Sequence, residues 1–456
     1  MIKQIASLLR QLVRWPPGKI TVYTSLILLA CALVFFFLTD TYLDGFLKDR
    51  ITSALEETYP AYSIRIAGLH YRMWENRLEC DSVALMKIDS TFSCSVARLS
   101  VSGIGRVQLL WGGGVAPDNL VSSDMDAEDI VLTFPRSQYE LRCERLRVSV
   151  PDSEIVVDAL EFHPLADDEQ FFAGSKFRRT RYRLVIPQCS VMGSACLGML
   201  EGKIHCGRTA QIQNPFLDIL INKDKPFAMD SLRPLMPNEL LSSIAKTIQL
   251  DSLNIMNGRL MYGERFVLGS KPALLMFDSM QVLAEGSSNS MYHGDTVVIR
   301  AGGKFMQTGT MNVFMSIPVA SPEFTFQYSG SLSGMGLSTL NPFLEVAENM
   351  RLKTGILHSA AFDIDVIAGS ASGIARIVYE DLKIVAIEDR TGSESGVGNI
   401  IVSFISNNIK LRTTNMPDKS GSMKIGDVKY KKKSDEAFME FAWFALRSGI
   451  GDVVGF

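Results

Sequence analysis

The side chains that could carry out acid–base or metal chemistry are scattered along this sequence. The five histidines are widely separated, at His70, His163, His205, His293 and His358, and none belongs to a His-Glu-x-x-His pattern. Such chemistry needs its groups at a spacing that brings them together on one element. The histidine positions therefore indicate neither a general base nor a metal site.

Two short motifs resemble functional loops but lack a required residue. Gly112-Gly113-Gly114 has no Lys-Ser/Thr pair after it, so it does not match a phosphate-binding loop. Ser194 follows Gly193 in a small-residue turn, but a nucleophile elbow needs glycine two residues before and after the serine. Met192 and Cys196 stand at those positions. An ordinary turn explains Ser194 better.

The acidic stretch at residues 124–128 resembles the start of a calcium-binding loop. Asp124, Asp126 and Glu128 have the required alternation, but the sixth position is Asp129 instead of glycine and the twelfth is Pro135 instead of glutamate. A solvated acidic loop explains the stretch better. The sequence therefore predicts no catalytic residue, no metal site and no cofactor, and we expect a protein that is not an enzyme.

The cysteines allow one specific prediction. Six follow residue 38: Cys80, Cys94, Cys143, Cys189, Cys196 and Cys206. None shows the Cys-x-x-Cys spacing of a zinc ribbon, and an even number is compatible with disulfides in an oxidising compartment. The nearest pair, Cys189 and Cys196, could close a hairpin and is the predicted disulfide. Buried free thiols are the alternative.

The composition favours a β-rich protein with large apolar surfaces. The net charge is −3, so no basic surface for nucleic acid is expected, and hydrophobic residues make up 47% of the chain. Val, Ile, Thr, Phe and Gly are frequent, and long helical patterns are few. The apolar residues must fill cores or line a binding surface.

Residues 20–38 carry no charge and are predicted to form a transmembrane helix. As a helix this segment is about 28 Å long, close to the thickness of a bilayer core. A cleaved signal peptide fits less well because apolar residues continue through Phe35-Phe36-Phe37-Leu38. A lipoprotein signal at Cys31 is also disfavoured, since the residues that follow are apolar.

The flanking charges predict the orientation of this helix. The basic residues Lys3, Arg10, Arg14 and Lys19 precede it, whereas Asp40 and Asp44 follow it. The positive-inside rule then places residues 1–19 in the cytoplasm and the body of the protein on the other side of the membrane.

The rest of the chain predicts a few amphipathic helices between many short strands. Helices are expected near residues 42–58, 238–248 and 340–351, each from apolar residues at three- and four-residue steps. Alternating runs separated by turn residues predict antiparallel strands, starting at residues 63–66, 71–73 and 78–81. Residues 163–180 are polar and predicted to be an exposed loop.

Two alternating runs place aromatic and aliphatic residues on one face of a strand. They are Phe324, Phe326 and Tyr328 in the first run and Phe362, Ile364 and Val366 in the second. Such a face fits either the core of a β-sandwich or the lining of an apolar groove. Alternation alone favours the sandwich.

The C-terminal residues 412–456 combine a basic linker with an amphipathic helix. Lys429, Lys431, Lys432 and Lys433 precede an aromatic-rich segment whose apolar residues are Phe438, Phe441, Trp443 and Phe444. These four residues are predicted to contact an anionic bilayer surface. A terminal helix that caps the β body is the alternative, and both remain open.

Three stretches of the C-terminal half resemble the AsmA-like family of bacterial envelope proteins. They are residues 250–264, residues 324–330 through Leu340-Asn341-Pro342-Phe343, and residues 355–362 with 373–384. The likeness covers about residues 240–456 and the N-terminal anchor, whereas residues 70–235 match only in style.

This resemblance implies a long, curled antiparallel sheet that forms an open groove, with residues 39–235 and 236–411 as its two regions. It selects the groove over the sandwich, with Phe324, Phe326, Tyr328, Phe362, Ile364 and Val366 contacting lipid. It also implies a Gram-negative inner-membrane protein with a periplasmic body. Such a protein would move phospholipid toward the outer membrane, with an outer-membrane or periplasmic partner. A non-enzymatic scaffold for outer-membrane biogenesis is the alternative function.

Overall fold

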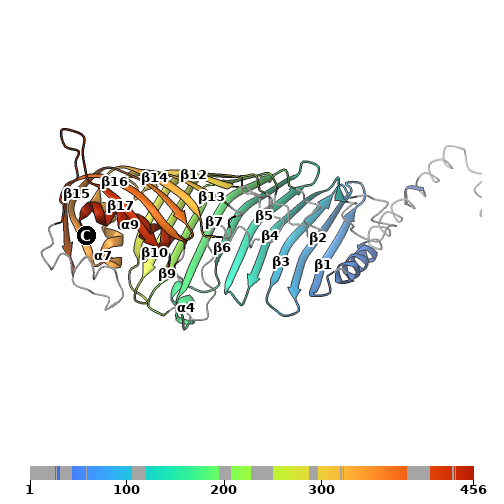
Figure 1. Cartoon of the computed structure of the whole chain (residues 1–456). Coiled ribbons are helices and arrows are strands. Elements are labelled where there is room, and N and C mark those ends of the chain that lie inside the picture. The colour runs from blue at the N-terminus through green and yellow to red at the C-terminus, as the bar shows by residue number, and fades with distance from the viewer. Residues whose placement is uncertain are drawn as a thin grey trace, which may run out of the picture.

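The computed structural model describes residues 26, 28–30, 44–57, 59–104, 120–194, 207–226, 250–286, 296–318, 321, 323–387, 411–433, 436 and 438–455. Within them the protein is mainly β, with one sheet of 17 strands and few helices. The strands lie side by side along the length of an elongated molecule (Figure 1). The predicted β-rich fold is confirmed, and the two packed sheets of a sandwich are not what forms.

Nine strands make up the N-terminal half of the sheet. They are β1 (Tyr62–Arg72), β2 (Arg77–Lys87), β3 (Ser93–Ser102), β4 (Asp124–Phe134), β5 (Tyr139–Ser149), β6 (Glu154–Pro164), β7 (Arg179–Met192), β8 (Thr209–Gln213) and β9 (Phe216–Asn222). The other eight are β10 (Ser252–Arg265), β11 (Ala273–Glu285), β12 (Thr296–Phe305), β13 (Gly309–Pro318), β14 (Phe326–Gly336), β15 (Met350–Ile367), β16 (Ser370–Ala386) and β17 (Ile425–Lys431).

Strands that follow one another in the chain pair antiparallel, except around β8 and β9. These two short strands share one position, because β8 pairs with one end of β7 and β9 with the other. Both then run parallel to β10. The sheet is therefore mixed, which corrects the wholly antiparallel sheet expected from the sequence. The connection from β9 to β10 includes residues 227–249, which are outside the described residues. The helix expected at 238–248 falls in this range.

In the strands of the N-terminal half, the alternation of apolar and polar side chains shifts by one residue near the middle of the strand. On β5, Leu141 and Cys143 lie on the apolar face before the change and Leu146 after it, with Glu144 and Arg145 between them. Similar pairs of polar or small residues are Asp81-Ser82, Glu128-Asp129 and Asp158-Ala159, and the second residue of each has a φ near +50°. The register with the neighbouring strands is the same on both sides of each step, and both halves of each strand keep their apolar residues on the same side of the sheet.

At these steps, alternating charges lie opposite one another on the polar face of the sheet. Asp81, Arg98, Glu128, Arg145 and Asp158 are cross-strand neighbours in that order, from β2 to β6. Arg98 and Glu128 are joined by an ion pair of 2.9 Å. Opposite charges at facing positions favour this register over a shifted one, so the row helps to fix the alignment of the strands.

A helix at residues 44–57 covers the first edge of the sheet, close to the predicted 42–58. Its Leu47 and Ile51 are buried against the apolar face of β1 and β2. Its polar side chains bind the free edge of β1, since the Tyr71 N–H donates to Asp44 (2.8 Å) and Lys48 donates to the Ala67 carbonyl (2.9 Å).

The helix α9 (Phe438–Val454) covers the other edge, β17, and continues through Gly449 and Gly451. The Asp427 N–H donates to the Asp452 carboxylate (2.9 Å) and the Lys429 N–H to the Ser448 hydroxyl (3.1 Å). A Cβ atom on Gly426 would lie 2.1 Å from the carbonyl oxygen of Gly449, so glycine permits this close approach. Strand β17 lies in what the sequence indicated as a linker.

Two other helical elements are short. The 3₁₀ helix η2 (Leu337–Leu340) and α7 (Asn341–Ala347) lie near the helix expected at 340–351. The helix α4 (Asp168–Ala173) corrects the exposed loop predicted at 163–180. Phe171 and Phe172 of α4 are each only 1% exposed, and Asp167 caps the helix by accepting from the Gln170 N–H.

The predicted transmembrane segment 20–38 falls almost wholly outside the described residues. Of its positions, only Leu26 and residues 28–30 are described, and these are helical. Among the described residues, no helix has the length and apolar character required to cross a bilayer.

Candidate functional site

The two alternating runs singled out in the sequence lie on neighbouring strands. Phe326 of β14 faces Val366 of β15, and Tyr328 faces Ile364. Phe362 lies opposite Gly330, where a Cβ atom would be 2.6 Å from the phenylalanine ring. The runs therefore do share one apolar face, as the alternation predicted.

That face is covered by α9 in this part of the sheet (Figure 1). The ring centroids of Phe326 and Phe438 are 5.5 Å apart, and the Tyr328 hydroxyl donates to the Ala442 carbonyl (3.1 Å). Ile364 and Val366 are 0% and 1% exposed. Here the apolar face and α9 form a sealed core, so a ligand would reach these side chains only if α9 moved.

The four tail residues predicted to contact a bilayer belong to α9 and differ in exposure. Phe441 is fully buried, with its ring 5.1 Å from that of Phe324, and Phe438 also packs on the sheet. Phe444 lies 5.8 Å from Tyr430, whereas Trp443 is 42% exposed. The burial of Phe438 and Phe441 favours the capping alternative for this helix.

The same face continues into β3–β6, where the helix α4 packs on Tyr139 of β5 and Phe162 of β6. We call this region the central apolar face; its residues are Cys94, Val96 and Leu99 of β3, Ala127, Ile130 and Leu132 of β4, Cys143 and Leu146 of β5, and Val157 of β6. In the described part of the chain this cluster consists of strand residues alone. Six of its nine side chains are only partly buried, whereas Ile364, Val366 and Phe441 in the core beneath α9 are at most 1% exposed.

The central apolar face is bounded at both ends along the sheet. Toward β1, it meets the cluster that the helix at 44–57 forms with β1 and β2. Toward β10, it meets polar side chains. Lys223 pairs with Glu264 (2.7 Å), and Tyr262 donates to the same carboxylate (2.7 Å). Burial raises the pKa of the nearby Glu348, whose Oε2 has no hydrogen-bond partner among the described residues.

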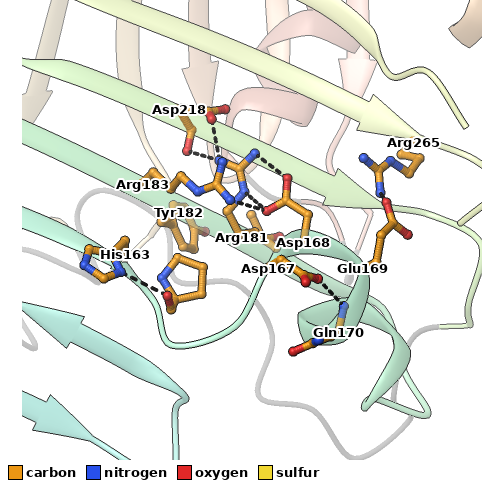
Figure 2. Close-up of polar contacts among 12 residues, drawn as sticks. His163, Asp167, Asp168, Glu169, Gln170, Arg181, Tyr182, Arg183, Asp218 and Arg265 are labelled. Carbon is orange, nitrogen blue, oxygen red and sulfur yellow. Dashed lines mark hydrogen bonds and ion pairs between the residues drawn. The ribbon is translucent and has the colours of Figure 1, made fainter. Parts of the chain in front are cut away.

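Polar contacts with β7 and β9 anchor α4 at the ends of these interior strands (Figure 2). Arg181 is 3% exposed and lies between Asp168 of α4 (3.1 Å) and Asp218 of β9 (2.6 Å). Arg183 also pairs with Asp168 (2.8 Å), and Arg265 pairs with Glu169 of the same helix (2.8 Å). With its charge matched by two carboxylates, the buried Arg181 has a structural role and offers no site for an anion.

The described residues contain no group of three or more His, Cys, Asp or Glu side chains arranged to hold a metal ion. Cys80, Cys94, Cys143 and Cys189 are free thiols. Cys189 therefore gives no support to the predicted disulfide, and its proposed partner, Cys196, is outside the described residues. Three of the four thiols, those of Cys94, Cys143 and Cys189, lie on β3, β5 and β7.

Neither models of known protein families nor curated protein sequences match this chain. The functional interpretation therefore depends on the geometry of the central apolar face and on the resemblance noted in the sequence.

Proposed function

We propose that the central apolar face is the floor of an open groove that binds the acyl chains of phospholipid. The observation that carries this proposal is the cluster from Cys94 to Val157, which consists of strand residues and is only partly buried. A contiguous apolar surface that stays partly accessible to water is a candidate binding site. Each methylene that leaves water contributes about 0.8 kcal/mol, so about ten methylenes supply about 8 kcal/mol.

The membrane setting of the proposal comes from the sequence. The uncharged residues 20–38 anchor the protein in an inner membrane, the basic flank keeps residues 1–19 in the cytoplasm, and the sheet lies in the periplasm. Together with the AsmA-like resemblance, this makes the protein a participant in phospholipid transport between the inner and outer membranes. It acts by binding lipid and not by catalysis.

Neighbouring valines on β6 allow a matched test of the groove. Val157 faces Leu146 on the apolar face, whereas Val156 faces Arg147 on the polar face. Val157→Glu should therefore abolish the lipid that co-purifies with the protein, because an unpaired charge beside hydrocarbon is costly. Val156→Glu places the same charge in water and should leave bound lipid unchanged. Mass spectrometry of extracted lipid and the melting temperature are measured for both variants.

A photo-crosslinking amino acid at the same two positions gives a second readout that does not depend on the tolerance of the fold for a charge. Crosslinks to lipid should form from position 157 and not from position 156. Wild-type protein without bound lipid, or equal crosslinking from both positions, would contradict the groove and favour the scaffold alternative.

A further inference from the structure

The turn between β1 and β2 carries a very exposed tryptophan. Trp74 is 81% exposed, the highest value among the large apolar side chains of the described residues, and the adjacent Met73 is 38% exposed. Neither is needed for the core that β1 and β2 form with the helix at 44–57. Single exposed apolar side chains are common on protein surfaces, whereas several that occur together mark a contact surface.

This turn lies beside the first residues of the helix at 44–57. Asp44 accepts from the Tyr71 N–H (2.8 Å) and contacts the His70 ring (2.9 Å), so it is held at the end of β1 that leads into the turn. Phe46, in the first turn of the helix, is 46% exposed, and the Arg50 guanidinium lies over its ring. Three exposed apolar side chains thus occur at one corner of the sheet.

The chain also connects this corner to the uncharged segment 20–38. Six residue steps separate Leu38 from Asp44, and an extended chain covers at most about 3.5 Å per step, or about 20 Å in total. A bilayer crossed by residues 20–38 therefore has its surface within about 20 Å of Asp44. Tryptophan is enriched at that depth, because its indole combines an apolar body with a polar N–H.

We propose that Met73, Trp74 and Phe46 insert into the interfacial layer of the bilayer that residues 20–38 span. This inference rests on the membrane anchor of the proposed function and adds a second contact with the same membrane. The anchor and this interfacial contact together hold the first strands against the bilayer. The helix α9 then lies at the end of the sheet that is far from the bilayer.

The test uses the full chain reconstituted in phosphatidylcholine vesicles that contain brominated lipid. The protein has four tryptophans, at positions 15, 74, 111 and 443. One variant keeps Trp74 alone and a matched variant keeps Trp443 alone, with phenylalanine at the other three positions. We expect brominated acyl chains to reduce Trp74 emission by at least about half and to leave Trp443, on the exposed side of α9, unchanged.

The outcomes separate this inference from the anchor itself. Vesicle flotation measures the anchor, and protein that does not float with the vesicles would overturn both the anchor and the interfacial contact. Protein that floats while Trp74 is unquenched, or quenched no more than Trp443, would overturn only the interfacial contact. In Trp74→Ser, flotation should persist, because residues 20–38 remain.

Discussion

The thiol of Cys80 shows how strongly the helix at 44–57 shields the apolar face of β2. Cys80 lies on β2 beneath the helix at 44–57 and is 5% exposed. Burial raises the pKa of this thiol to about 11, because the thiolate would lose its hydration. Burial also raises the pKa of Cys94, Cys143 and Cys189. All four positions therefore disfavour the reactive thiolate.

We predict that Cys80 resists alkylation in the folded protein. A pKa increase of two units from the ordinary value of 9 reduces the thiolate fraction at pH 8 about 100-fold. Peptide mapping after a short iodoacetamide pulse should find Cys80 unmodified in buffer and modified in urea. Rapid labelling in buffer would show that the helix at 44–57 does not shield β2.

The same pKa shift predicts a pH dependence of stability. Burial of the neutral Cys80 thiol contributes fully to the free energy of unfolding below pH 9, where the thiol is neutral in the folded and the unfolded state. This contribution is lost as the pH rises from 9 toward 11, because the unfolded thiol ionises first.

At the scale of elements, the structure assigns α9 a part in the core. Its Phe441 is fully buried, whereas Trp443, two residues later, is 42% exposed. Because of this difference, deletion of the whole tail would not test membrane contact alone. Deleting residues 434–456 would uncover Phe326, Tyr328, Ile364 and Val366, so a loss of vesicle binding would follow from unfolding as readily as from a lost membrane contact.

Two point substitutions on α9 separate packing from surface contact. Phe441→Ala should lower the free energy of unfolding by about 3–5 kcal/mol, as expected for a buried aromatic side chain. Trp443→Ala should lower it by about 1 kcal/mol or less. Chemical denaturation of both variants measures the difference, and equal losses would contradict the described position of α9.

The sequence predicted the elements better than their contacts. Local periodicity located the helix at 44–57, the strands β1 and β2, and the shared face of Phe326 and Tyr328. It missed α4, although Asp167 before a Phe171-Phe172 pair was an available signal. It could not place α9 over Tyr328, because that contact joins residues 114 positions apart.

The central apolar face was missed for a different physical reason. Its strands reverse their parity midway, at pairs such as Glu128-Asp129 and Glu144-Arg145. Across a whole strand, apolar residues therefore occur at both odd and even positions and show no single alternation. The apolar face becomes visible only when each half of the strand is considered separately. A charged or small pair that recurs at the centre of successive strands was the signal that could have revealed the face.

At the scale of the whole molecule, both edge strands have side-chain partners for their backbone. Exposed edges invite pairing with another sheet, and the helices at 44–57 and α9 prevent this at opposite ends. We predict that the double variant Ser448→Ala, Asp452→Ala frees the N–H groups of Asp427 and Lys429 and promotes concentration-dependent association.

Light scattering across a dilution series measures this association. The exposed residues Ser359 and Asp365 of β15 provide a matched control, since Ser359→Ala with Asp365→Ala leaves both edges capped. If the edge variant and the control have the same mass at every concentration, the capping bonds do not govern association.

Because both edges are capped, the sheet also has a fixed length. Seventeen strands, two of which share a position, occupy sixteen positions, and a spacing of about 4.8 Å gives a span of about 70 Å. A second copy cannot extend this span by continuing the hydrogen-bonded ladder. In the proposed function, lipid that crosses a wider gap must therefore be handed to a different molecule.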